Sequence, residues 1–127
     1  MTQQIVFVTG SELLFETVSK VLIKMGFSAK RFSSDTIPVD IVPLTQCSLI
    51  IVDYYGLSET MLSFFQTHKT YLASQKIPIF GVISSMRHEE AQNTQDLRQT
   101  FLDAYLFMPF SPPELSQAIH HLMEQTS

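Results

Sequence analysis

The stretch SLIIVD, residues 48–53, decides the fold that this sequence predicts. Its run of consecutive aliphatic residues is typical of a strand buried on both faces, and such strands occur in parallel sheets that helices cover on both sides. The stretch ends on Asp53. Because ligands of α/β sheets bind beyond the carboxyl ends of the strands, Asp53 is the first candidate site residue.

Outward from this strand, short apolar runs alternate with segments of helical periodicity. We predict further strands at residues 4–8, 28–32, 77–83 and 104–108, and helices at residues 12–25, 58–74, 89–101 and 111–125. Residues 33–46 are predicted to form a loop with at most a short helix, because Pro38 and Pro43 cannot both lie inside one continuous helix.

The alternation of strands and helices predicts right-handed βαβ units. We therefore expect an α/β fold with a doubly wound, five-stranded parallel sheet in the order 2-1-3-4-5. Helices on both faces of that sheet would make a three-layer sandwich, and 127 residues fit one domain, residues 1–127.

The composition argues against several classes of protein. With a net charge of −4 and only eight Lys and Arg, we expect no nucleic-acid partner, because such a partner needs clustered basic residues. No apolar run reaches the roughly 18 residues of a membrane span, and the N-terminus lacks a signal-peptide pattern. We therefore expect a cytoplasmic protein without a membrane partner.

Metal and cofactor signals are weak. Cys47 is the single cysteine, so there is no internal disulfide or thiolate cage, and we expect this thiol to be buried and unreactive. His120 and His121 are adjacent on a predicted helix and point about 100° apart, which argues against a shared metal ion. No metal and no cofactor are expected.

Four stretches in this order carry a resemblance to a known family. They are QIVFVTGSELL at residues 4–14, SLIIVDYYG at 48–56, IPIFGVISS at 77–85, and DAYLFMPFSPPEL at 103–115. Together they resemble the receiver domain of bacterial two-component response regulators, over nearly the whole chain. The resemblance implies the flavodoxin-like fold of the CheY-like receivers, in agreement with the alternation of strands and helices.

The resemblance also implies a site in which an aspartate accepts a phosphoryl group, and Asp53 stands at that position. Family members hold Mg²⁺ with acidic residues after the first strand, where this sequence has Thr9 and Gly10. A lysine that contacts the phosphoryl group is replaced by Met108, which we expect to fill the vacated space against Ile83. With no acid beside it, Asp53 has no like-charged neighbour to raise its pKa.

Two further positions of the family are altered or ambiguous. Ile83 stands where the family usually has a hydroxyl residue, although the neighbouring Ser84 would substitute if the strand end slipped by one residue. Tyr105 matches the family's switch aromatic, and we favour a static residue, because a switch needs an input that differs between its two states. The pocket as a whole is interpreted as degenerate, a pseudo-receiver site.

These observations predict a stand-alone receiver-like domain that works in signalling by protein–protein contact, without aspartyl phosphorylation and without enzymatic activity. We expect no output domain to accompany it, because the receiver-like pattern runs to the end of these 127 residues. The resemblance implies that a signalling protein or sensor kinase docks on the face formed by helix 89–101, strand 104–108 and helix 111–125, which includes Tyr105. A homodimer through that face is a further expectation.

Two alternatives stay open. The first is a single-domain response regulator that accepts a phosphoryl group on Asp53 from a histidine kinase. The second is a small flavodoxin-like ligand-binding protein that uses the short polar loops TGS, residues 9–11, and SS, residues 84–85, at the strand ends.

Overall fold

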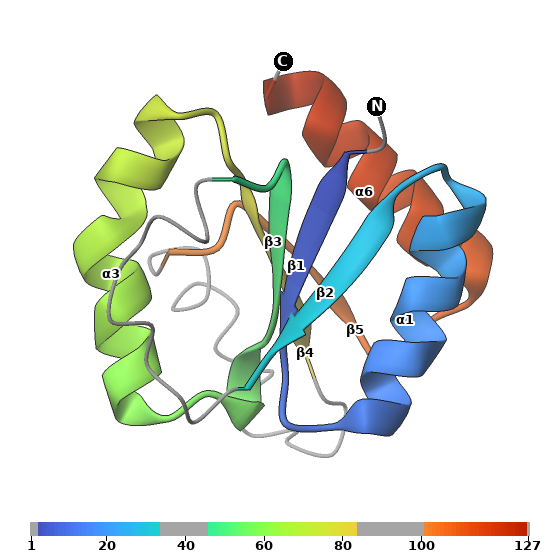
Figure 1. Cartoon of the computed structure of the whole chain (residues 1–127), viewed down its shortest axis with the longest axis horizontal. Helices are drawn as coiled ribbons and strands as arrows, with labels where there is room; N and C mark the ends of the chain where they lie inside the picture. Colours follow the sequence, from blue (N-terminus) through green and yellow to red (C-terminus); the bar gives the residue numbers. More distant parts are fainter. Residues whose placement is uncertain (1–2, 34–45, 84–100, 127) are drawn as a thin grey trace.

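Five parallel strands form the centre of the molecule (Figure 1). In this computed structural model the described residues are 3–33, 46–83 and 101–126. The strands are β1 (Gln4–Val8), β2 (Ser28–Phe32), β3 (Leu49–Asp53), β4 (Ile79–Ile83) and β5 (Ala104–Phe107). Their order is β2-β1-β3-β4-β5, which confirms the predicted doubly wound topology.

Helices cover both faces of this sheet. They are α1 (Glu12–Lys24), α3 (Glu59–Ser74) and α6 (Pro112–Thr126), with a short 3-10 helix η1 (Tyr54–Gly56) directly after β3. Figure 1 shows α1 and α6 on one face and α3 on the other, so the layers have the predicted α/β/α arrangement. The helix predicted at 89–101 and the loop predicted at 33–46 lie almost entirely outside the described residues.

The helix ends follow from local side-chain chemistry. The Ser11 hydroxyl accepts a hydrogen bond of 3.1 Å from the Leu14 N–H at the start of α1, and this cap satisfies one of the free N–H groups of the first turn. Ser111 and Glu114 bond each other's backbone N–H groups at the start of α6, at 3.3 and 3.2 Å, which is a capping box. Gly26 follows α1 with φ of 92°, a left-handed conformation that suits glycine.

Two apolar layers enclose the sheet. The layer under α3 is built around Phe65 and Ile83, and the layer under α1 and α6 around Phe7 and Val82. Successive residues of β4 alternate between these layers, because side chains of a strand point to opposite faces in turn. This alternation decides toward which face each residue at the carboxyl edge of the sheet projects.

The predicted strand at 77–83 begins two residues late, at Ile79. Pro78 has no N–H to donate, so the ladder begins after it, although the Pro78 carbonyl still accepts a bond of 3.1 Å from Ile50. None of the helices in the described part of the chain is long and apolar enough to cross a membrane.

Candidate functional site

The side chains of Thr9 and Asp53 meet at the carboxyl edge of the sheet. Thr9 follows β1 directly and Asp53 ends β3, the strand paired with β1 in parallel. The Thr9 hydroxyl donates a hydrogen bond of 3.2 Å to Asp53 Oδ2. Because Thr9 is fully buried, its hydroxyl is not in contact with bulk water and needs such a partner.

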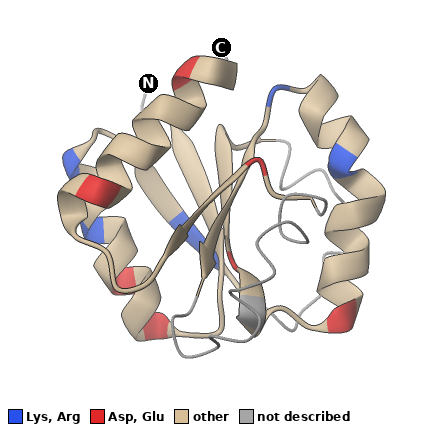
Figure 2. Ribbon diagram, turned by 180° about the vertical axis from the view of Figure 1, so that it is seen from behind, with Lys and Arg blue, Asp and Glu red and all other residues tan. Residues whose placement is uncertain are grey.

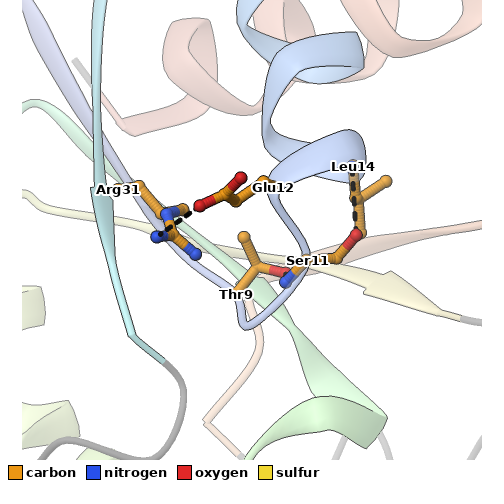
Figure 3. A network of polar contacts seen from close by, with 5 residues as sticks. All are labelled: Thr9, Ser11, Glu12, Leu14 and Arg31. Carbon is orange, nitrogen blue, oxygen red and sulfur yellow. Dashed lines mark hydrogen bonds and ion pairs between the residues drawn. The ribbon is translucent and has the colours of Figure 1, made fainter.

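Thr9 is also the centre of the loop between β1 and α1. Its hydroxyl accepts a bond of 3.1 Å from the Ser11 N–H, and its own N–H donates to the Phe32 carbonyl at the end of β2. Figure 3 shows this loop, with Arg31 of β2 reaching toward Glu12 at the first residue of α1. That pair spans 3.7 Å between exposed side chains, so it contributes little to stability.

Asp53 is held from a second side by η1. The Gly56 N–H bonds its carboxylate, and a Cβ added at Gly56 would lie only 2.8 Å from Asp53 Oδ2. The pKa of Asp53 is raised above its ordinary value of 3.8, because burial disfavours the charged form more than the bonds from Thr9 and Gly56 favour it. Burial, not a neighbouring acid, is the cause of this raised pKa, and no pattern in the sequence indicated it.

Met108 does not pack as predicted. Its N–H donates a bond of 2.8 Å to the Ile83 carbonyl, but the two side chains lie on opposite faces of the sheet. Ile83 is buried in the layer under α3, whereas the half-buried Met108 packs against the layer under α1 and α6. The reason is the register, in which Ile83 pairs with Phe107, so that Met108, the residue directly after β5, turns to the other face.

The remaining predicted positions are partly described. Gly10 is exposed in the loop after β1 and brings no side chain to the pocket, and Ser84 lies outside the described residues. Tyr105 is half-buried on β5 and packs edge-on against Phe107, with ring centroids 5.5 Å apart. Both rings contact the apolar layer under α3. Tyr105 lies on the strand that the sequence predicted at residues 104–108.

This site does not fit Mg²⁺. Magnesium requires several hard oxygen ligands in an octahedral arrangement. Here one carboxylate, Asp53, faces a threonine hydroxyl that already bonds it. Among the described residues no group of three or more His, Cys, Asp or Glu side chains could hold a metal ion.

The other titratable candidates have local roles. Cys47 is buried as predicted, and this burial raises the pKa of its thiol from 9.0 to about 11. His120 pairs with Glu124 at 2.9 Å, and His121 bonds Gln125 at 3.1 Å. The two histidines therefore have separate partners, as their position on the helix predicted.

The fold of the whole chain is similar to that of several solved structures. The fold superposes on a response regulator receiver domain protein from Clostridium thermocellum with a TM-score of 0.71, over 97% of this chain and 95% of that one, at 12% identity. The chain has the receiver-domain fold. No protein-family model matches the sequence, and no curated protein matches it either.

Two further structures extend the comparison. A proposed pilus assembly-related protein from Burkholderia pseudomallei has a TM-score of 0.77 and 14% identity, with 99% of this chain and 92% of that one covered. NtrX from Brucella abortus has a TM-score of 0.72 and 14% identity, over 99% of this chain. This chain spans only 27% of the NtrX chain, so it corresponds to one part of that larger protein.

Sequence reasoning found Asp53, Thr9 and Met108 but missed how they are held. The hydrogen bond between Thr9 and Asp53 was detectable in principle, because Thr9 follows one predicted strand and Asp53 ends its neighbour in the predicted sheet. The approach of Gly56 to the carboxylate had only one signal, the glycine three residues after Asp53. Sequence spacing alone does not predict that a 3-10 helix folds this backbone over the aspartate.

Proposed function

We propose that this chain is an atypical receiver domain that acts in signal transduction through contact with other proteins, without enzymatic activity and without phosphorylation of Asp53. One observation carries the proposal. The Asp53 carboxylate accepts a hydrogen bond from Thr9. In the family that this chain resembles, the position of Thr9 is held by a metal-binding acid.

The physical argument concerns charge. Transfer of a phosphoryl group to a carboxylate brings together two anions, so cations must neutralise the charge in the transition state. Neither Thr9 nor Gly10 offers a carboxylate to hold Mg²⁺, and Met108 offers no ammonium group. Thr9 also occupies a lone pair of the nucleophilic carboxylate. The scaffold is therefore more suitable for recognition than for chemistry.

The proposed docking surface is the side of the domain that includes β5 and α6. Tyr105 and Phe107 form a half-buried aromatic pair on β5. Aromatic side chains that are partly exposed supply large contact areas at low entropic cost, and they are enriched in protein interfaces. The partner is proposed to be a signalling protein or sensor kinase, or a second copy of the domain, in the cytoplasm.

A phosphodonor experiment tests the first half of the proposal. The purified protein is incubated with Mg²⁺ and a small-molecule phosphodonor such as acetyl phosphate, and its intact mass is measured. We expect no phosphorylated species in the wild type or in the Asp53→Ala control. A phosphorylated wild type together with an unmodified Asp53→Ala variant would instead establish the phosphorylatable response regulator.

Affinity capture from the native cell tests the second half. The wild type and Asp53→Ala are expected to retain the same partner, because binding does not depend on a phosphoryl group. Tyr105→Ser and Phe107→Ser should lose it, while Tyr71→Ser, an exposed aromatic on α3, serves as the matched control. Loss of the partner with Asp53→Ala alone would contradict the proposal.

The ligand-binding alternative has one supporting observation. A groove of about 840 Å³ lies at the amino edge of the sheet, where Phe27, Ile77 and Met123 provide apolar lining and Lys76 a positive charge. This volume is within the range of small-molecule sites. The groove is at the edge opposite to Asp53, not at the loops that the sequence indicated. Native mass spectrometry of the purified protein tests it, since a co-purifying small molecule would support this function.

A further inference from the structure

The outer face of α1 exposes two large aliphatic side chains. Leu13 in its first turn is 74% exposed and Ile23 in its last turn is 63% exposed. The inner face of the same helix buries Val18 and Leu22 against the sheet. Leu13 and Ile23 therefore contribute nothing to the core, and their exposure to water is unfavourable in an isolated domain.

Two opposite charges lie between these side chains. Glu16 and Lys20 are exposed on α1, and neither makes an ion pair with another residue in the described parts of the chain. At 100° per residue, Ile23, Glu16, Lys20 and Leu13 fall within about 80° of one another around the helix axis. They form one surface, here called the α1 face.

The α1 face is complementary to itself when two copies run antiparallel. Leu13 and Ile23 are each five positions from Val18, and Glu16 and Lys20 are each two positions from it. In an antiparallel pair centred on Val18, Leu13 of one copy is level with Ile23 of the other, and Glu16 is level with Lys20. Figure 2 shows the acidic residues near the start of α1 and the basic ones near its end.

From this arrangement we propose that the α1 face is a homodimer interface, in which two α1 helices pack antiparallel about a twofold axis at the level of Val18. A twofold dimer uses the same patch on both subunits and therefore needs a self-complementary surface. The pairing aligns apolar with apolar and acid with base, and a parallel pairing would place Glu16 beside Glu16. This inference goes beyond the proposed function and does not depend on it.

The geometry predicts a weak and reversible dimer. One pair of helices of about four turns each buries less surface than a standard interface, so we expect a dissociation constant on the order of 100 µM. Charge pairs at such an exposed interface are screened by salt, so the dimer should weaken as ionic strength rises. Tyr105 and Phe107 pack on the other face of the sheet, so pairing through α1 leaves them available to a different partner.

Sedimentation equilibrium of charge-reversed variants tests the interface. Glu16→Lys places lysines opposite lysines, and Lys20→Glu places glutamates opposite glutamates, so each variant alone should dimerise at least about tenfold more weakly than the wild type. An equimolar mixture of the two variants should dimerise again, because both charge pairs across the axis then join a lysine to a glutamate. Glu59→Lys makes the same change of charge on α3, and it should leave dimerisation unchanged.

Three results would overturn the proposal. The first is a wild type that remains monomeric at millimolar concentration. The second is association that both single variants retain at wild-type strength. The third is a mixture of Glu16→Lys and Lys20→Glu that stays monomeric, since rescue depends on the antiparallel pairing itself. Circular dichroism of each variant confirms that the fold is intact, and Leu13→Ser provides a second disruption that does not change charge.

Discussion

The Thr9 hydroxyl donates a 3.2 Å hydrogen bond to Asp53 Oδ2, and this bond joins the ends of two adjacent strands at the centre of the sheet. In the family that this chain resembles, acidic residues after the first strand, where Thr9 stands here, bind a metal ion. Here a neutral hydroxyl connects the ends of β1 and β3 through a direct hydrogen bond. The contribution of this site to the stability of the fold can therefore be tested, in addition to its ability to accept a phosphoryl group.

Replacing Thr9 with valine removes the hydroxyl at nearly constant volume. Asp53 Oδ2 loses a donor and the Ser11 N–H loses an acceptor, so the free energy of unfolding should fall by about 1–2 kcal/mol. Urea denaturation measures this. Thr17→Val is the matched control, because the Thr17 hydroxyl only bonds the Leu13 carbonyl on an exposed helix surface, and it should change stability by less than about 0.5 kcal/mol.

The bond between Thr9 and Asp53 can be isolated by a double-mutant cycle with Asp53→Ala. A coupling free energy of about 1 kcal/mol is expected for two residues in direct contact. Strict additivity of the two substitutions would show that the hydrogen bond contributes nothing in solution.

A second prediction concerns the pH dependence of stability. Because burial raises the pKa of Asp53 in the folded state, the folded protein binds a proton more tightly there than the unfolded chain. The contribution of Asp53 to stability is therefore greatest at low pH and is lost as pH rises from the ordinary pKa of 3.8 through the raised value. Other carboxyl groups also make the stability depend on pH, so the pH dependence of the wild type alone does not isolate the contribution of Asp53.

The comparison with Asp53→Asn isolates it. We expect the stability of the wild type, relative to Asp53→Asn, to fall as pH rises above the ordinary pKa of 3.8, measured by urea denaturation at each pH. NMR titration of the Asp53 carboxyl carbon should give a midpoint above 3.8. A difference that instead rises with pH would mean that the hydrogen bonds from Thr9 and Gly56 outweigh the burial.

The sequence predicted the framework of this protein better than its site. Residues 48–53 indicated a buried strand because exposing a run of aliphatic side chains to water is unfavourable, and β3 is buried as expected. Ser111 and Glu114 indicated the start of α6 because both partners of the capping box lie within one turn of helix. Such signals are local, and local chemistry is visible in a sequence.

The details that were missed depend on contacts between distant segments or on backbone conformation. The orientation of Met108 depends on the register between β4 and β5, and a shift of one residue reverses every side chain. Lys76, which follows α3, adopts φ of 59°, a left-handed conformation for which glycine would have been the signal. The burial of Asp53 depends on the path of η1, which residue types alone do not determine.

Gly56 gives a third prediction. An added methyl group would lie 2.8 Å from Asp53 Oδ2, so Gly56→Ala must displace the carboxylate or the turn, at a cost of about 1–2 kcal/mol in the free energy of unfolding. Asp53→Ala removes the atom that clashes. In that background, Gly56→Ala should therefore be close to neutral. An equal cost in both backgrounds would locate the strain in the backbone of η1 and not in this contact.

The last prediction returns to Met108. Asp53 pairs with Val82, and Val82 pairs with Leu106, two residues before Met108, so Met108 and Asp53 project toward the same face of the sheet. A lysine at position 108 could keep its ammonium near the surface while its aliphatic stem replaces the thioether. Met108 is only half-buried, so Met108→Lys should lower the free energy of unfolding by about 1 kcal/mol.

Met108→Lys should not by itself allow phosphorylation, because no acid is present to hold the metal ion. Combining it with Thr9→Asp and Gly10→Asp supplies two carboxylates beside Asp53 and frees that residue from the threonine hydroxyl. We expect the triple variant, and not the single one, to show Mg²⁺-dependent phosphorylation by a small-molecule phosphodonor in intact mass. Adding Asp53→Ala should abolish it. Phosphorylation of Met108→Lys alone would show that another group already supplies the metal site, and the interpretation of a degenerate pocket would then be wrong.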